Sequence, residues 1–514
     1  MKSTFFFFLF TCLFACVYSQ PGIIWNTSVP GVLAPQVDPP PKIHFDSDGN
    51  ILTLQHARDF DNQDIWLVKL DSDGNIFWSA TYDSPFGLTD RAQHIYVDRS
   101  GNIYIHGFTQ TKIILDGGLV DWEIAPLTLK YSPGGQLLWE HIMEVENYNS
   151  DSNPTSVIAD SIGNCYVTGG KWDSIHATFN MYLTKYDTTG WVEWEIFESN
   201  DIFSTCGLQL AYLGDSIRVR RRANSNDLDE RYLSTLIYDL DGNQLKDYTE
   251  PIVNWYSTVK KAEDNQGNFY WMSGRSIFKY DQFSGSQWQY DEIPTGTNSL
   301  IFDFVVDEEE NVYLTGSNEG MFTAKLDANG NELWKTWNAF STAGRHLDVD
   351  ADGNVTAGCY KYENLLFYMN LVQYSSDGAQ TGSIVYANAN IDDIRIYDDA
   401  SFITTIRDYN ETDIVTVQRY DLVLPIVDPG PVPAQELIIF PNPATDQLSF
   451  RFPGKTFRKG SLMIKDICSR LVYQKDMEAL PDNQIDVSHL IPGIYFLEIL
   501  TDEKRYVGKF VVEE

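Results

Sequence analysis

Two kinds of turn alternate along the 514-residue chain, and their spacing constrains the fold more than any other feature of the sequence. The first kind is typified by KLDSDGNIFW (69–78), where an apolar strand end, an Asp-Ser-Asp-Gly-Asn turn and a strand ending on Trp78 follow one another. It recurs as KYSPGGQLLW (130–139), KYDTTGWVEW (185–194), IYDLDGNQL (237–245), KYDQFSGSQW (279–288), KLDANGNELW (325–334) and QYSSDGAQ (373–380).

The second kind of turn lies between successive copies of the first and is typified by FDSDGNILTL (45–54). It recurs as VDRSGNIYIHG (97–107), ADSIGNCYVTG (160–169), EDNQGNFYWMSG (263–274), VDEEENVYLTG (306–316) and VDADGNVTAG (349–358). Alternating apolar residues around a Gly or Asn at positive φ predict a β-hairpin at each turn. Because each kind recurs about every fifty residues, one unit has two hairpins, which is typical of a β-propeller blade.

The two ends of the repeat array complement each other. PGIIWNTSV (21–29) resembles a fourth strand that no hairpin precedes, and TDIVTVQRYDL (412–422) resembles a third strand that no fourth strand follows. A ring closes when one terminus completes the blade that the other terminus began, which removes an exposed sheet edge. We therefore predict one propeller over residues 20–424, closed by its N-terminal strand.

The number of blades follows from the turns of the first hairpins. These turns fall near Gly49, Gly101, Gly163, Gly214, Gly267, Glu310, Gly353 and Asp399. Two of them, in LGDSIRV (213–219) and YDDASFI (397–403), lack the Gly-Asn pair. If both are accepted the propeller is eight-bladed, and if one merges into a neighbour it is seven-bladed; we prefer eight.

The charge balance limits the partners of this all-β chain. Its 37 Lys and Arg residues against 72 Asp and Glu residues give a net charge of −35. Nucleic acid requires a basic surface, so we expect no nucleic-acid partner, whereas cationic partners or Ca²⁺ are compatible with this charge. After the N-terminal segment, no stretch reaches the ~18 apolar residues of a membrane helix, so no transmembrane segment is predicted.

Residues 1–19 are predicted to be a secretory signal peptide. A lysine precedes the apolar stretch 4–17, and the small Ser19 precedes the cleavage site. The sequence LFAC also resembles a lipoprotein box with Cys16 as the lipidated residue, although Phe14 is bulky for that motif.

The repeat ends before residue 425. PIVDPGPVP (425–433) predicts a stiff, Pro-rich linker. The segment 434–514 predicts a small β-sandwich because short alternating strands recur between turn residues. The expected strands are LIIF (437–440), QLSFRF (447–452), SLMIKDI (461–467), LVYQKD (471–476), GIYFLEIL (493–500) and YVGKFVV (506–512).

The last segment resembles a known family, the type A C-terminal sorting domain of the bacterial type IX secretion system. The resemblance lies in IFPNPATDQLSF (439–450), IKDICSRLVYQ (464–474), IDVSHLIPGIYFLEI (485–499) and KFVV (509–512). Its motif residues are Pro441, Asn442, Pro443, Gly493, Tyr495 and Lys509. The resemblance implies interaction with the type IX machinery and a secreted or outer cell-surface location in a Gram-negative bacterium.

The turns ending on Trp resemble the repeats of quinoprotein-like and outer-membrane-assembly propellers. In those families each Trp packs between blades, which implies such a role for Trp78, Trp139, Trp194, Trp288 and Trp334. Most members bind no quinone, so no cofactor is implied. The sialidase Asp-box is disfavoured because the spacing of Asp71, Gly74 and Trp78 differs from it and no arginine triad is evident.

The Asp-x-Asp-Gly-Asn turns also suggest calcium, because carboxylates suit this ion. A calcium loop needs a bidentate acid about twelve residues after its first ligand, and these turns have none. We therefore expect Asp to cap the turn while Gly and Asn take left-handed φ. Calcium is possible but disfavoured, and no metal site is predicted.

The only basic cluster is Arg218, Arg220, Arg221 and Arg222. We interpret it as an edge-strand charge that blocks pairing, with a ligand site as the alternative. No nucleophile elbow, zinc-protease motif or P-loop occurs in the sequence.

Propeller topology places both kinds of Gly turn on one face and the variable connecting loops on the other, where binding specificity usually resides. The candidate binding residues at the channel mouth on that second face are Asp90, Arg91, Asn153, Arg345, His346, Asp392 and Asp393. We expect a non-catalytic surface or secreted scaffold that binds an unknown extracellular ligand, either protein or carbohydrate. The alternative is a polysaccharide hydrolase or lyase with Asp90 and Asp392 as acid and base.

Overall fold

The computed structural model divides the chain into two compact units, Met1–Val427 and Asp428–Glu514. The described residues are 23–30, 42–59, 62–114, 120–144, 152–173, 176–198, 203–225, 230–251, 258–283, 285–292, 300–317, 320–338, 343–363, 366–387, 389–398, 401–408, 414–421, 435–436, 438–440, 442–451, 459–466, 471–478, 484–488, 490, 493–501 and 505–513. The predicted signal peptide and the Pro-rich linker lie outside them.

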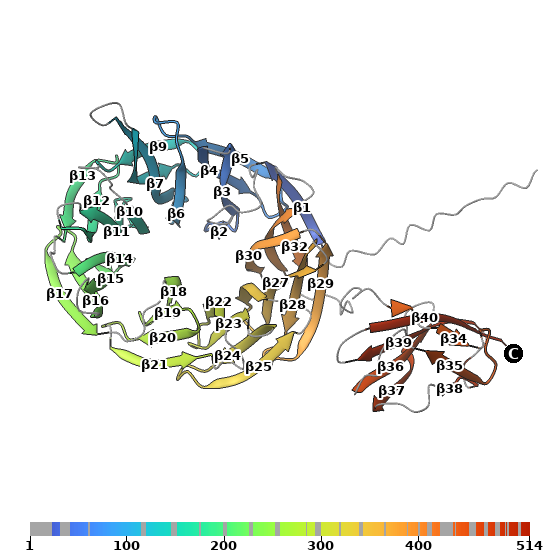
Figure 1. The fold of residues 1–514 in the computed structure, drawn as a ribbon. Helices are drawn as coiled ribbons and strands as arrows, with labels where there is room; N and C mark the ends of the chain where they lie inside the picture. Colours follow the sequence, from blue (N-terminus) through green and yellow to red (C-terminus); the bar gives the residue numbers. More distant parts are fainter. Residues whose placement is uncertain are drawn as a thin grey trace, which may run out of the picture. The chain divides into compact units, whose positions relative to one another are not determined.

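The first unit is a ring of four-stranded antiparallel sheets, which confirms the predicted propeller class (Figure 1). Seven sheets follow one another in the chain. Their strands are β2 (Lys42–Phe45), β3 (Ile51–Asp59), β4 (Asn62–Leu70) and β5 (Ile76–Tyr82); β6 (Asp90–Val97), β7 (Ile103–Ile114), β8 (Val120–Tyr131) and β9 (Leu137–Ile142); β10 (Ser152–Ala159), β11 (Cys165–Asp173), β12 (Thr178–Tyr186) and β13 (Val192–Phe197); β14 (Phe203–Tyr212), β15 (Ser216–Ser225), β16 (Arg231–Asp239) and β17 (Gln244–Pro251); β18 (Thr258–Glu263), β19 (Phe269–Ser273), β20 (Ser276–Tyr280) and β21 (Ser286–Asp291); β22 (Leu300–Val306), β23 (Val312–Ser317), β24 (Met321–Leu326) and β25 (Glu332–Asn338); and β26 (Ala343–Val349), β27 (Val355–Glu363), β28 (Leu366–Tyr374) and β29 (Gln380–Ala387).

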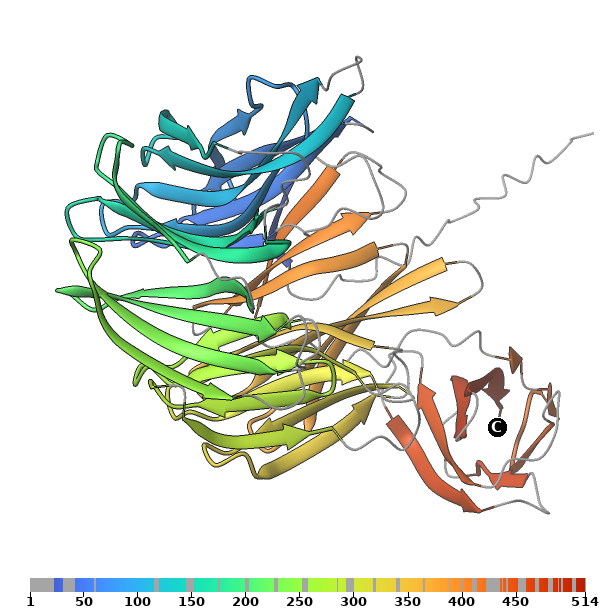
Figure 2. The same ribbon diagram turned by 60° about the vertical axis from the view of Figure 1, so that its left-hand side comes forward.

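One further sheet combines the two ends of the unit. Strands β30 (Ala389–Asp398), β31 (Ser401–Asp408) and β32 (Ile414–Asp421) are completed by β1 (Ile23–Pro30), which pairs antiparallel with β32. The described part of this unit thus contains eight four-stranded sheets, the larger of the two blade numbers considered from the sequence. In each, the first strand lies nearest the centre of the ring and the fourth lies outside, and Figure 2 shows the same sheets from the side.

The Asp-Gly-Asn turns are closed by hydrogen bonds within each turn. In the turn before β5, Asp71 Oδ1 accepts the backbone N–H groups of Asp73 (2.9 Å) and Asn75 (2.8 Å). Asp71 Oδ2 accepts Nδ2–H of Asn75 (2.9 Å), and Gly74 has φ of 81°. The carboxylate of such an aspartate therefore caps its own turn, as predicted.

The expectation that the turn asparagines share the left-handed conformation is wrong. Among the described non-glycine residues, only Ala177 and Glu310 have positive φ. The asparagines instead donate Nδ2–H to the turn aspartate, which secures the carboxylate from the side. They are Asn50, Asn75, Asn102, Asn164, Asn243, Asn268, Asn311, Asn331 and Asn354.

Tryptophans at the start of the outer strands pack onto the next sheet. A Cβ atom on the glycine of the facing turn would lie between 2.5 and 3.0 Å from the nearest indole carbon, so only glycine fits there. The pairs are Trp25 on Gly74, Trp78 on Gly135, Trp139 on Gly190, Trp194 on Gly242, Trp288 on Gly330 and Trp334 on Gly378. The inter-blade role implied by the repeat resemblance is therefore confirmed, and Trp25 of β1 adds a sixth pair.

The edge-strand interpretation of the arginine cluster is wrong. The cluster lies in β15, which is paired on both sides, to β14 and β16. Arg220 is 1% exposed, and its guanidinium donates to the carbonyls of Gly267 (2.9 Å) and Asp281 (3.1 Å) in the next sheet, while Arg218 pairs with Glu263 there. Strand β17 carries no Trp, and these arginines join its sheet to the following one.

The apolar cores lie between adjacent sheets. One of them joins Leu52 and Leu54 of β3 to Ile95 of β6 and to Ile103 and Ile105 of β7, all of which are buried. Similar buried clusters lie at the other junctions, because a sheet packs its two faces against two neighbours.

The second unit is built from two sheets that enclose one core, consistent with the predicted small β-sandwich. The five-stranded sheet has the order β33 (Gln435–Glu436), β40 (Arg505–Val512), β39 (Gly493–Thr501), β36 (Lys459–Asp466) and β37 (Leu471–Glu478). The three-stranded sheet has the order β34 (Ile438–Phe440), β35 (Gln447–Arg451) and β38 (Gln484–Asp486). No helix in the described part of the chain has the length and apolar content needed to cross a membrane.

Several residues of the sorting motif have clear structural roles. Asn442 Nδ2–H donates to the Lys509 carbonyl (3.0 Å), and Asn442 Oδ1 accepts the N–H of Val511 (2.9 Å), so one side chain anchors the segment before β35 to β40. Tyr495 is buried and stacks on Phe510. Pro443 follows Asn442 in a cis peptide bond, Gly493 begins β39, and Pro441 lies outside the described residues.

Candidate functional site

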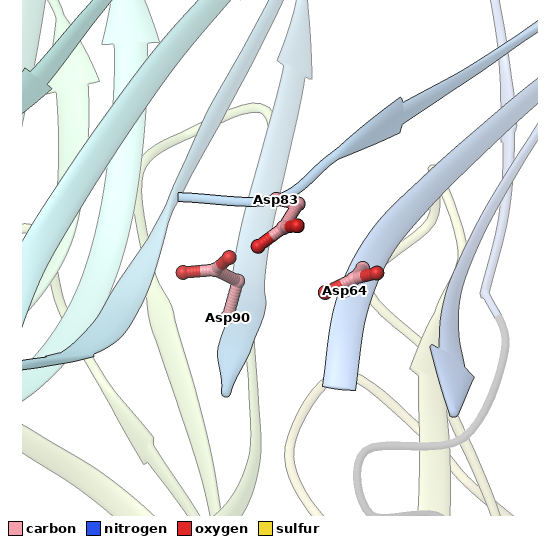
Figure 3. A group of neighbouring side chains, drawn as sticks. All are labelled: Asp64, Asp83 and Asp90. Atoms are coloured by element: carbon pink, nitrogen blue, oxygen red, sulfur yellow. The ribbon is translucent and has the colours of Figure 1, made fainter. Parts of the chain in front are cut away.

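Three carboxylates converge at the junction between the first two sheets in chain order (Figure 3). Asp64 lies near the start of β4, Asp83 directly follows β5, and Asp90 begins β6. One carboxylate oxygen from each residue lies within 4.8 Å of one oxygen from each of the others. The site is at the ends of the strands away from the Gly turns, on the face predicted to carry the binding loops.

The strand register explains why the first two aspartates meet. Ile65 of β4 pairs with Tyr82 of β5, so Asp64 and Asp83 occupy the next cross-strand position. The chain then crosses to the following sheet through residues 83–89 and places Asp90 opposite Thr109 of β7.

Asp90 is fully buried but only partly hydrogen-bonded. Its Oδ2 accepts the backbone N–H of Ser84 (2.7 Å), whereas its Oδ1 is buried and has no hydrogen-bond partner. Burial raises the pKa of Asp90 to about 6, and the charge of Asp64 acts in the same direction. A carboxylate in this setting favours either a bound proton or a nearby cation.

Asp64 faces a similar environment. Its Oδ1 is also buried without a hydrogen-bond partner. Burial and the neighbouring charge of Asp83 raise its pKa. Among the described residues, no lysine or arginine forms an ion pair with Asp64, Asp83 or Asp90. The cluster therefore concentrates negative charge that no described side chain neutralises.

Of the residues predicted at the channel mouth, Asp90 and Arg91 lie at this junction. Arg91 Nε–H donates to Gln63 Oε1 (2.8 Å), so it joins β6 to β4. Its guanidinium also lies 6.0 Å from the ring of Phe108.

The other predicted residues are spread over different sheets. Arg345 of β26 stacks over Phe302 (4.1 Å), and burial lowers the pKa of its neighbour His346. Asp392 and Asp393 of β30 are both buried. Asn153 lies in β10, and its side chain is outside the described part of the structure.

Several polar side chains near the centre of the ring join neighbouring sheets. Asp393 Oδ2 accepts the N–H of Ile43 (2.9 Å), and Asp303 Oδ2 accepts the N–H of Leu347 (3.0 Å). The same kind of contact recurs at four other places, where a side chain accepts a backbone N–H of the next sheet. The pairs, acceptor first, are Asp348 and Ile396, His56 and Ala92, His94 and Val157, and Ser156 and Leu210. These groups satisfy backbone donors of the next sheet, which gives them a structural role.

The two residues nominated for acid–base catalysis come from sheets that are not neighbours in the ring. Asp90 begins β6, whereas Asp392 lies in β30, and the sheet of β2–β5 lies between these two in the ring (Figure 1). Asp64 and Asp83 were missed from the sequence. Their signal was the hairpin register, which places two aspartates opposite each other once Ile65 and Tyr82 are paired.

Comparison with known proteins identifies the C-terminal unit. Residues 438–513 match the secretion system C-terminal sorting domain, which confirms the predicted type IX sorting domain. No match was found among curated proteins.

Solved structures similar to the chain have low identity to it. They include the C-terminal WD40 domain of Sif2 (9% identity, TM-score 0.43, covering 76% of this chain and 96% of that chain). A protein of unknown function from Bacteroides caccae is also similar (9% identity, TM-score 0.32, covering 59% of this chain and 97% of that chain). Likeness at this level carries no argument about what the chain does.

Proposed function

We propose that this type IX-exported propeller is a non-catalytic scaffold that binds an extracellular ligand through the face that carries its inter-hairpin and inter-blade loops. The observation that supports the proposal is that ionisable side chains near the centre of the ring form hydrogen bonds between the sheets. Asp303, Asp348, Asp393, His56 and His94 accept backbone N–H groups of adjacent sheets. Groups occupied in this way are poorly placed to exchange protons with a substrate.

The carboxylate geometry also favours binding over glycoside hydrolysis. Glycosidases hold two carboxyl groups roughly 5–10 Å apart on opposite sides of the scissile bond. Asp64, Asp83 and Asp90 are instead gathered within 4.8 Å, and Asp90 has no exposed surface. Asp392, the partner once considered for Asp90, belongs to another sheet.

The loop next to the cluster offers an aromatic contact surface. Phe86 lies in the connection between β5 and β6 and is 47% exposed. Exposed aromatic side chains on a rigid scaffold are common anchors for sugars and peptides because they present apolar area at low entropic cost. Trp191, which is 77% exposed, lies in a Gly turn on the opposite face and so provides a matched control.

The test is a polysaccharide and glycan array probed with the mature protein, paired with a reducing-end assay on every bound glycan. We expect retention without release of new ends, loss of retention in Phe86→Ala, and unchanged retention in Trp191→Ala. Release of sugar ends or unsaturated products that depends on Asp90 would instead support the hydrolase or lyase. Equal loss in both aromatic variants would place binding elsewhere than the loop face.

A further inference from the structure

The hairpin of β4 and β5 places two like charges opposite each other. Asp64 and Asp83 occupy facing positions at its end, where like-charged pairs destabilise a sheet. A third carboxylate, Asp90, enters the same space from the next sheet. Figure 3 shows the carboxyl groups of Asp83 and Asp90 turned toward each other, with Asp64 beside them.

The way in which Asp90 is buried is a further sign of a ligand at this cluster. Asp90 is 0% exposed, and its Oδ1 has no hydrogen-bond partner. Leaving a buried acceptor unpaired costs about 1–3 kcal/mol, and more when it is charged. Asp64 Oδ1 is buried and unpaired in the same way. Two unpaired oxygens at one junction leave acceptor capacity that a bound cation would satisfy.

We propose that Asp64, Asp83 and Asp90 bind one calcium ion between the sheet of β2–β5 and the sheet of β6–β9. All three groups are hard oxygen donors, which suit Ca²⁺ and disfavour zinc or copper because no nitrogen or sulfur ligand belongs to the group. Oxygens around one Ca²⁺ can lie up to about 4.8 Å apart, twice a bond of about 2.4 Å. Water and backbone carbonyls would complete the coordination.

The turn aspartates differ from this site in the way their oxygens are used. Asp71 accepts two backbone N–H groups and one side-chain N–H, all from its own turn. Its oxygens therefore face hydrogen-bond donors, whereas Oδ1 of Asp64 and Oδ1 of Asp90 are buried with no such donor. The proposed ion thus lies at the blade junction. In the turns, the aspartate caps the backbone by hydrogen bonds and is not part of the proposed site.

Bound calcium would fix the connection 83–89 between the two sheets. Asp83 begins this connection and Asp90 ends it, so one ion would hold both ends against β4. Calcium sites of extracellular modules typically have dissociation constants of about 0.1–1 mM. A site of that strength would be filled outside the cell, where the sorting domain sends the protein.

The experiment uses the mature full-length protein in chelator-treated buffer, with calorimetric titration of CaCl₂ and thermal unfolding followed by tryptophan fluorescence. All 13 tryptophans lie in the propeller, so this signal reports on it alone. We expect one ion per chain, and at a hundredfold excess over the dissociation constant a rise in melting temperature of about 3 °C. The same concentration of MgCl₂ is expected to give a smaller shift.

Asp83→Asn is the decisive variant because Asp83 is exposed and its replacement leaves no buried group unpaired. It should lose the calcium response and, in EDTA, melt above the wild-type protein, since the like-charge repulsion is gone. Asp73→Asn removes one exposed charge from a turn and should keep the full response. The assignment would be overturned if the wild-type protein showed neither binding heat nor a melting shift, or if Asp83→Asn kept the full response. It would also be overturned by several ions per chain or by an equal effect of Mg²⁺.

Discussion

The contact between Trp78 and Gly135 can be tested by adding one methyl group. Gly135 has φ of 81°, and a Cβ atom there would lie 2.5 Å from Cδ2 and 2.6 Å from Cε3 of Trp78. Left-handed φ costs alanine about 1–2 kcal/mol. Overpacking against the ring adds about 1–3 kcal/mol. Gly135→Ala should therefore lower the free energy of unfolding by about 2–5 kcal/mol.

Gly214→Ala separates the two contributions. Gly214 has φ of 94°, but nothing lies within 4 Å of the position its Cβ would take. This variant should lose only about 1–2 kcal/mol, and the effect of alanine on the unfolded chain is the same in both. The difference of about 1–3 kcal/mol is then the cost of displacing the indole.

Urea unfolding followed by tryptophan fluorescence measures both variants, with Trp78→Leu as a second background. If the indole of Trp78 causes the extra cost, Gly135→Ala and Gly214→Ala should become equally destabilising once Trp78 is leucine. The argument that the indole packs on Gly135 would be refuted if both variants cost the same in the wild-type background. It would also be refuted if Gly135→Ala still cost more after Trp78 is replaced by leucine.

Three further predictions concern the ring, its export and its response to acid. Deleting residues 21–29 exposes the edge of β32, so we expect a lower melting temperature and aggregation on size-exclusion chromatography; an unchanged melting curve would contradict ring closure. A chain ending at Leu424 should remain in the periplasm of a type IX-competent host, and its detection in the medium would contradict the sorting role. Burial lowers the pKa of both His44 and His106 to about 3, so the unfolded chain takes up protons first as pH falls below about 6.5. Each histidine should thus remove about 2 kcal/mol of stability between pH 7 and pH 5, and urea midpoints that do not change with pH would contradict this.

The fold class could be predicted from the sequence because the turn residues and the strand periodicity indicate the same structure. Asp71, Gly74 and Asn75 close a turn by contacts inside five residues, so the pattern specifies its own geometry. The role of the asparagine was misassigned because an Asn can serve a turn either by φ or by its side chain, and the residue type alone does not distinguish the two.

The candidate site was less predictable because it depends on partners far apart in the chain. Asp90 was recognised from its place at the start of a first strand, but Asp64 and Asp83 required the register of β4 and β5. The sequence predicts a channel position for Asp393, yet its carboxylate accepts the N–H of Ile43, 350 positions away. The periodic pattern of the sequence does not predict a contact between residues so far apart.

The arginine cluster shows how departures from a repeat become informative once the junctions are compared. Six junctions use a Trp on a turn glycine, and the sheet of β14–β17 lacks that Trp. At this junction Arg220 is buried, donates to the Gly267 and Asp281 carbonyls and lies 5.3 Å from the ring of Phe269. A buried guanidinium needs acceptors to offset its desolvation, and turn carbonyls supply them. Arg218 and Arg220 thus form a polar blade junction next to an outer strand that has no Trp.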